Sequence, residues 1–232
     1  MHRKMVPLLL LISFLFVATA FAREQSCVNP PEVVVTTADV ETFVEICSAA
    51  EKAITFLAQY DLRPQGPITI EIVAHKIDNH GLISYGSYDG NSNRLQLMSY
   101  ASIFATSKNP MMFGEPFDRV HYSGVIAHEV THAVVEHYTK VKKYSGPSQE
   151  YLAYATQLAT MPEERRNAII RAMNVEPWQA GDEISNIYMA MAPGKFAVKS
   201  YLHLMSLKHP AAFIDILLNV NWFYVSVPKD AG

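Results

Sequence analysis

The chain has 232 residues, half of them hydrophobic, and a net charge of −3 at pH 7. This length is enough for one sizeable core, and the slightly acidic balance argues against nucleic acid or an anionic membrane surface as a partner. A peptide or protein substrate remains open.

The first 22 residues have the pattern of a secretory signal peptide. Basic residues near the start precede an almost wholly apolar run from Val6 to Ala18, and Ala20-Phe21-Ala22 offers a small-x-small cleavage site. An uncleaved membrane anchor is the alternative, but the apolar run is short for a span of about 20 residues. We therefore expect cleavage after Ala22, no stable membrane anchor afterwards, and a periplasmic or extracellular protein.

The mature chain, residues 23–232, is expected to form one domain. It keeps 17 basic and 22 acidic residues, a net charge of −5 with histidine neutral. Cys27 and Cys47 are its only cysteines. A disulfide between them is the plain expectation for an exported chain, because a thiolate zinc site would need a second cysteine pair or a CxxC spacing.

The N-terminal part, about 33–138, combines a helix with a small sheet. A short strand at Val33–Val35 precedes capping residues at Thr37–Asp39, and apolar residues at helical spacing then predict the first core helix, from Val40 to about Leu57. Three strands are predicted after it: Ile68–Val73, Leu82–Tyr88 and Arg94–Met98. His75 and His80 lie in the connecting loop, where solvated side chains are expected rather than metal ligands.

Helices dominate the rest of the chain. Ser107–Pro116 is irregular, and Asp118 can cap a helix that runs to about Tyr138. The C-terminal part, about 148–220, is predicted to hold helices starting near the following residues: Ser148 as a cap, Pro162, Asp182, Phe196 and Ala211. The order of helix, about three strands, then helices predicts an α+β fold, with the sheet packed on the helix that follows Asp118.

The segment Val125–Tyr138 carries the clearest chemical signal. His128, Glu129 and His132 form His-Glu-x-x-His within an apolar helix. Residues four apart share one helix face, so both imidazoles can bind one metal ion while Glu129 reaches a water molecule beside it. Two satisfied core histidines are the alternative. The motif predicts one zinc ion (Zn2+), because zinc would satisfy polar side chains that are costly in a buried helix.

A hydrolytic zinc site usually takes a third protein ligand. The metzincin pattern is excluded, since Val135 and Tyr138 occupy the positions of its glycine and third histidine. Glu136 lies one turn beyond His132, but a rigid helix would have to bend to bring it to the same ion. Glu150 is the better candidate, because it begins a downstream helix after a loop long enough to turn the chain back.

HExxH followed by a helix-borne glutamate resembles the gluzincin clan of zinc metallopeptidases, and in particular small secreted members described as peptidase-MA-like. The likeness covers about Ile68 to Leu218 and implies a zincin-like fold with a sheet ahead of the HExxH helix. Two positions depart from the clan's patterns. Tyr154 stands where thermolysin-like members have an aspartate, and Tyr151 follows Glu150 where many peptidase-MA-like chains have glycine.

The resemblance implies a peptidase mechanism. Zinc held by His128, His132 and Glu150 would activate water and polarise the scissile carbonyl, and Glu129 would be the general base. Gluzincins typically supply a later tyrosine or histidine to the oxyanion, and Tyr188 is our choice over Tyr201 and His203. A substrate backbone is expected to add to the edge strand within 82–88.

Two other hypotheses remain open. The first is a secreted zinc-binding interaction module of the same fold without catalysis, although such a site has no need of Glu129. The second is a helical core with chance histidines and no metal.

Overall fold

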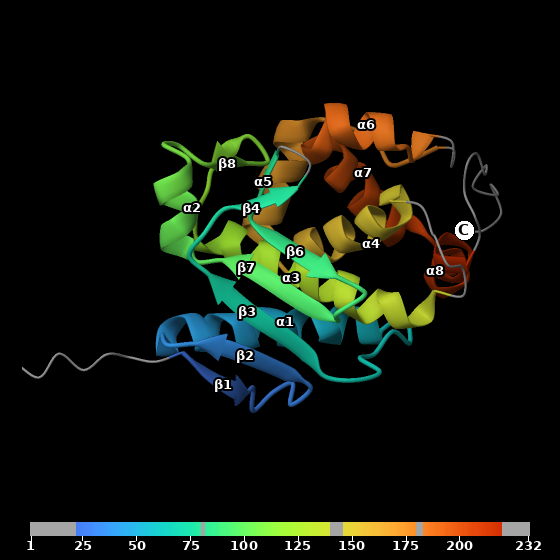
Figure 1. The fold of residues 1–232 in the computed structure, drawn as a ribbon. Coiled ribbons are helices and arrows are strands. Elements are labelled where there is room, and N and C mark those ends of the chain that lie inside the picture. The colour runs from blue at the N-terminus through green and yellow to red at the C-terminus, as the bar shows by residue number, and fades with distance from the viewer. Residues whose placement is uncertain (1–21, 80–81, 140–145, 180–182, 220–232) are drawn as a thin grey trace, which may run out of the picture.

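The computed structural model describes residues 22–79, 82–139, 146–179 and 183–219 (Figure 1). It has the expected α+β class, with a mixed N-terminal sheet and a helical C-terminal part. The main sheet has five strands, in the spatial order β1 (Arg23–Ser26), β2 (Val33–Thr37), β3 (Ile68–Val73), β7 (Arg94–Met98) and β6 (Gly86–Asp89). Strands β2, β3 and β7 are parallel, and the two outer strands are antiparallel to their neighbours.

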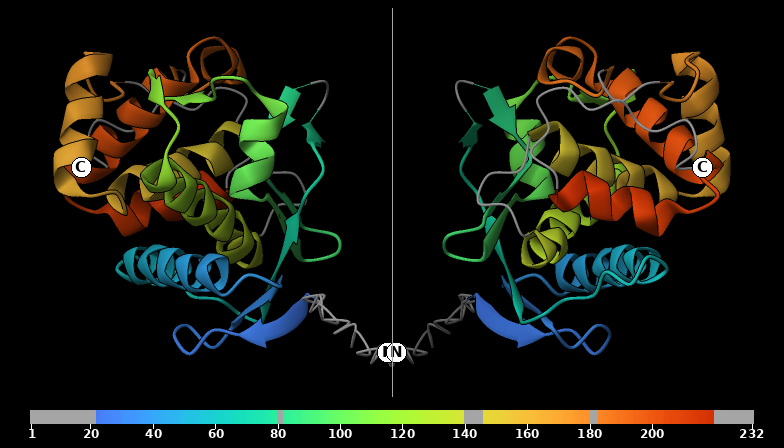
Figure 2. Two further views of the ribbon diagram at one scale, coloured as in Figure 1. Left: turned by 90° about the vertical axis from the view of Figure 1, so that its left-hand side faces the viewer. Right: turned by 90° about the vertical axis from the view of Figure 1, so that its right-hand side faces the viewer.

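Two long helices pack beside this sheet. Helix α1 (Val40–Ala58) connects the parallel strands β2 and β3, and Asp39 caps it by accepting a hydrogen bond from the Thr42 backbone N–H. Helix α3 (Arg119–Val135) packs on α1 and on strands β6 and β7. The side-on views in Figure 2 show α1 and α3 on one side of the sheet.

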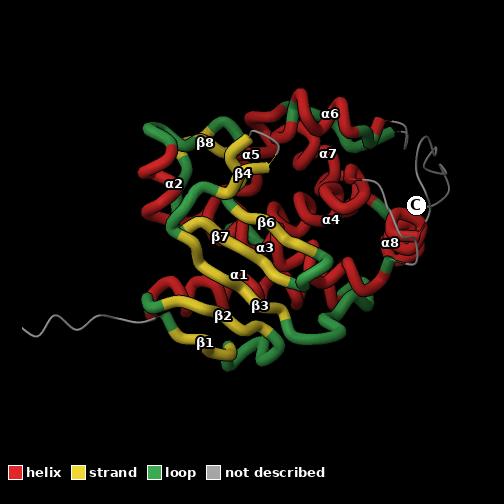
Figure 3. The backbone as a smooth tube through the Cα atoms, viewed as in Figure 1, coloured by secondary structure: helices red, strands yellow, loops and turns green. Residues whose placement is uncertain are grey.

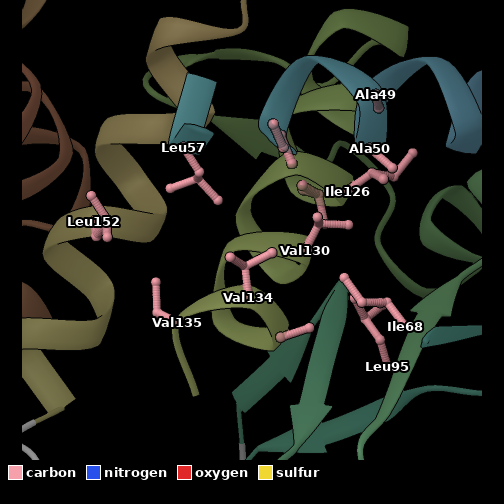
Figure 4. Close-up of a cluster of buried hydrophobic side chains, with 14 of the residues drawn as sticks. Ala49, Ala50, Leu57, Ile68, Leu95, Ile126, Val130, Val134, Val135 and Leu152 are labelled. Carbon is pink, nitrogen blue, oxygen red and sulfur yellow. The ribbon is translucent and has the colours of Figure 1, made fainter. Parts of the chain in front are cut away.

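The core lies between the sheet and these helices. Side chains of β2 and β3 alternate between buried and partly exposed, so one face of the sheet supplies Val35 and Ile70 to the core. Figure 4 shows apolar side chains of α1, the sheet, α3 and α4 meeting around Ile126, Val130 and Val134. Helix α3 is surrounded by α1, α4, β6 and β7. This explains why its side chains are apolar nearly all the way round.

The C-terminal part is a group of helices. These are α4 (Gly146–Ala159), α5 (Glu163–Met173), α6 (Asn186–Met191), α7 (Pro193–Ser206) and α8 (Pro210–Asn219). Helix α4 packs on both α3 and α7, so it joins the two parts of the fold. In Figure 3 these red helices lie above and to the right of the yellow sheet.

Short elements fill the connections. A small hairpin pairs β4 (Ile77–Asn79) with β5 (Leu82–Ser84), and another pairs β8 (Met111–Met112) with β9 (Glu115–Pro116). Helix α2 (Tyr100–Thr106) follows β7, and a 3-10 turn, Glu136–Tyr138, ends the helix that carries HExxH. His75 is exposed in the loop before β4, while His80 lies outside the described residues.

Several sequence-based boundaries are corrected. The sheet has five strands rather than about three, because Val33–Thr37 is a full strand and the exposed segment Arg23–Ser26 pairs with it. The single strand expected at 82–88 is two strands in different sheets, β5 and β6, separated at Tyr85. The chain turns there as the Ser84 hydroxyl donates to the Gly86 carbonyl.

Helix starts also differ from expectation. Helix α4 already includes Gly146, so Ser148 is a buried residue of its first turn rather than its cap. Pro162 is the N-cap of α5, and Ser185 caps α6 through the Tyr188 backbone N–H. The expected start at Asp182 and the end at Val220 lie outside the described residues.

Cys27 and Cys47 form the expected disulfide, which links the N-terminal arm to α1. Such a bond is compatible with export. The segment expected to be a signal peptide lies outside the described residues, apart from Ala22. Among the helices that the structure describes, none is both long and apolar enough to cross a membrane.

Candidate metal centre

Helix α3 holds the HExxH residues at the centre of the molecule. Asp118 fixes its N-terminus, since its carboxylate accepts a hydrogen bond from the His121 backbone N–H at 3.0 Å. One helical turn separates His128 from His132, and their ring centroids lie 4.9 Å apart. Both imidazoles therefore approach the same point from one face of the helix.

Glu150, in the first turns of α4, reaches that point from the opposite side. Its two carboxylate oxygens lie 3.3 Å from His128 Nε2 and 3.5 Å from His132 Nε2. The two Nε2 atoms are 3.1 Å apart. The packing of α4 across α3 thus brings together three side chains that could hold a metal ion.

These separations fit a small tetrahedral ion. Ligand atoms about 2.0–2.1 Å from a tetrahedral zinc ion are about 3.3 Å from one another. The two Nε2 atoms, 3.1 Å apart, are within a few tenths of an ångström of that value, and each lies 3.3–3.5 Å from a different oxygen of Glu150. Two imidazoles and one carboxylate are also a ligand set of catalytic zinc sites.

The charges of the three groups are strongly coupled. Burial alone would raise the pKa of Glu150, but the neighbouring imidazoles lower it to about 2. Burial lowers the pKa of His132 to about 4. Burial also acts to lower the pKa of His128, but Glu150, with smaller contributions from Glu129 and Gln157, raises it overall. The Glu150 carboxylate therefore requires positive charge beside it, which an imidazolium or a bound cation can supply.

Glu129 lies beside the ligand group and is not part of it. Its side chain is almost completely buried, at 7% exposure, and burial raises its pKa to about 7. It lines the same cleft as His128 and His132. A carboxylate in this position can exchange a proton with a molecule bound in the cleft.

Tyr154 is a residue that the sequence did not assign to the site. It lies one turn after Glu150 on α4, and its ring centroid is 4.6 Å from that of His128. It lines the cleft together with Glu129 and Glu150. Burial raises the pKa of its hydroxyl, so the group stays protonated at neutral pH and can donate a hydrogen bond. Its position four residues after the third candidate ligand was the available signal.

Tyr188, the expected oxyanion donor, has different surroundings. It is half-buried on α6, and its ring packs edge-on against Trp178 with centroids 5.1 Å apart. Of the residues on α6, Met189 and Ala190 line the cleft beside the ligand group. The packing of Tyr188 is that of a core aromatic residue.

The other residues that were considered lie away from the ligand group. His203 is buried and its Nδ1 atom is 2.7 Å from the Tyr151 hydroxyl. Tyr201 packs near the guanidinium group of Arg166. Glu136 is in the 3-10 turn after α3 and does not join the ligand group found in the described residues.

Two recesses meet at Glu129. The larger is an open cleft of about 560 Å³ that contains the ligand group and is bordered by β6 and α6. The smaller, of about 210 Å³, continues between β5, α3 and α4 and shares these residues with the larger: Ser84, Gly86, His128, Glu129 and Tyr154. Its additional lining combines the apolar side chains of Ile83, Met112 and Val125 with the polar groups of Tyr85 and Gln157. Because the two recesses share these residues, an extended ligand could lie along both of them, past the candidate metal ligands.

The geometry defines an α+β protein with a candidate metal centre of two histidines and one glutamate, placed in an open cleft. The model of a family of unknown function, DUF6639, matches residues 33–227, and the chain belongs to this family. No curated protein matches the chain. No solved structure matches it either.

Proposed function

We propose that the protein is an exported zinc peptidase with a zincin-like fold. The observation that carries this proposal is the convergence of His128, His132 and Glu150 into a group that could hold one metal ion, with Glu129 buried beside them in an open cleft. A zinc site that only stabilised the fold would be closed by four protein ligands. Three ligands beside a carboxylate in a cleft favour hydrolysis.

The residues of the chain have distinct roles in this mechanism. Bound zinc would supply an activated water molecule and a Lewis acid for the scissile carbonyl. Glu129 accepts the proton of the attacking water and passes it to the leaving amine nitrogen. The Tyr154 hydroxyl donates a hydrogen bond to the oxygen that becomes negatively charged, a role that its position beside His128 supports better than the position of Tyr188 does.

Strand β6 supports a polypeptide as substrate. It is the last strand of the five-stranded sheet on the cleft side, as far as the chain is described. The Tyr85 carbonyl accepts from the Met98 N–H, so in the antiparallel pattern the backbone groups of Gly86 and Tyr88 point away from β7. An extended peptide can pair with that edge, and the smaller recess beyond Glu129 offers room for a side chain next to the scissile bond.

Glu129→Gln tests the proposal. Glutamine keeps the shape of the side chain but cannot accept the proton, so the variant should bind zinc like the wild type and cleave casein at least about a hundredfold more slowly. Zinc content and melting temperature are measured on both proteins before the assay. Equal cleavage by the two proteins would contradict the assignment. Zinc binding without cleavage by the wild type would favour the non-catalytic module.

A further inference from the structure

Strand β6 passes directly over helix α3, and its first residue contacts the side chain of Glu129. Gly86 is buried. A Cβ atom built on it would lie 2.5 Å from Glu129 Cγ, 2.9 Å from Cδ and 2.8 Å from Oε1. Real Cβ atoms do not approach heavy atoms this closely, and the three nearest atoms all belong to Glu129. A side chain at position 86 would therefore displace the Glu129 carboxylate, and only glycine lets the strand backbone pack this closely on it.

A second glycine, in the turn just after the strand, has a similar relationship to another glutamate. A Cβ atom on Gly90 would lie 3.0 Å from Glu136 Oε1 and 3.1 Å from its Cδ. Glu136 belongs to the 3-10 turn that follows α3, and Gly90 to the turn that follows β6. Strand β6 and its turn thus lie along the C-terminal end of α3, with a glycine opposite each carboxylate.

We propose that Gly86 is a positioning residue for Glu129, because its lack of a side chain lets the edge strand pack on the carboxylate and hold it toward the cleft. This inference rests on the proposed peptidase function. Gly86 would also offer its backbone to a substrate strand. One residue would then set both the position of the base and the position of the peptide bond, which fixes the distance between them.

Gly86 is needed for the space that it leaves and not for its backbone conformation. Neither Gly86 nor Gly90 has a φ angle in the left-handed region, so alanine fits the backbone at both positions. Gly86→Ala and Gly90→Ala are therefore a matched pair. Both add one methyl group opposite a glutamate, Gly86→Ala within β6 and Gly90→Ala in the turn after it, but only the first acts on Glu129.

The contact is tested first without any activity assay. Gly86→Ala should lower the melting temperature of the metal-free protein by about 3 °C or more, as expected of an overpacked buried site. In a Glu129→Ala background, where the contacting atoms are gone, the same substitution should cost much less. Gly90→Ala should cost the same in both backgrounds. Equal losses from Gly86→Ala in both backgrounds would overturn the inference. If Gly86→Ala does not fold, recovery of folding in the double variant supports the contact, and failure of both contradicts it.

The consequence for chemistry is tested on zinc-loaded protein. Gly86→Ala should keep the wild-type zinc content and KM but lose roughly ten- to hundredfold in kcat. In a Glu129→Gln background it should cause little further loss, since no base remains to be displaced. Gly90→Ala should keep the wild-type rate. An unchanged kcat in Gly86→Ala would overturn the positioning role. If the wild type cleaves nothing, the peptidase proposal fails, whereas the melting-temperature comparison still decides the contact.

Discussion

The ring of Tyr154 lies edge-on to the imidazole of His128, with centroids 4.6 Å apart and planes 73° apart. Because Tyr154 is one turn beyond Glu150 on α4, the helix that supplies the third candidate ligand also brings this tyrosine to the lining of the cleft. The candidate ligand and the proposed hydrogen-bond donor thus lie on the same helix, which favours a fixed geometry between them.

This relationship predicts the effects of two tyrosine substitutions. Tyr154→Phe should retain zinc and lower kcat by about 10²-fold or more, because an oxyanion would lose a hydrogen-bond donor. Tyr188→Phe is the matched control and should cleave at nearly the wild-type rate, since Tyr188 packs on Trp178. Steady-state kinetics on one peptide decide between them. A large loss in Tyr188→Phe alone would restore the assignment expected from the sequence.

A second prediction concerns the ligand set. His128→Ala and His132→Ala should each abolish stoichiometric zinc binding, and Glu150→Ala should weaken it at least about tenfold, because each removes one of three ligands. Glu136→Ala is the control and should bind zinc normally. Metal analysis after dialysis and titration calorimetry measure the change. Full zinc retention in Glu150→Ala would show that Glu150 is not the third ligand.

The HExxH helix and Glu150 could be predicted because their signals are local. Helical periodicity puts His128 and His132 on one face, and a carboxylate at the start of the next long helix needs only a loop that turns back. The helix over Val40–Leu57 could be predicted for the same reason, because its capping residue Asp39 and the spacing of its apolar residues are local signals.

What the sequence did not predict depends on contacts between distant segments. Arg23–Ser26 is wholly exposed and lacks an apolar pattern, so only its pairing with β2 makes it a strand. The sequence of residues 82–88 resembles one continuous strand. The chain instead leaves one sheet after β5 and enters another at β6, where Gly86 packs against Glu129. The position of the Tyr154 ring beside His128 depends on how α4 crosses α3, and the spacing of four residues after Glu150 was the only signal of it in the sequence.

A third prediction concerns the disulfide. Intact-mass analysis after alkylation without reductant should find no labelled thiol in the exported protein, and should give Arg23 as the N-terminal residue. Replacing Cys27 and Cys47 by alanine should lower the free energy of unfolding by about 3 kcal/mol, because the bond closes a loop of 20 residues between the N-terminal arm and α1. Two labelled thiols in the exported protein would contradict this.

The last prediction uses a buried histidine outside the site. His203 Nδ1 is 2.7 Å from the Tyr151 hydroxyl, its ring packs on Phe213, and burial lowers its pKa from 6.5 to about 4. As the pH falls, the unfolded chain therefore binds a proton at this residue at a higher pH than the folded chain does. The contribution of the neutral histidine to stability is complete above about pH 6.5 and is lost as the pH falls toward 4, by up to about 3 kcal/mol.

His203→Gln should remove that part of the pH dependence, because glutamine can still accept the Tyr151 hydrogen bond but does not titrate. Urea unfolding of the metal-free protein at pH 7, 5.5 and 4.5 measures it. The wild type should lose stability more steeply than the variant across this range, even if the variant is less stable at pH 7 through poorer packing. His75→Gln, in an exposed loop, is the control and should follow the wild-type slope. Parallel curves for wild type and His203→Gln would show that the buried imidazole does not contribute to acid unfolding.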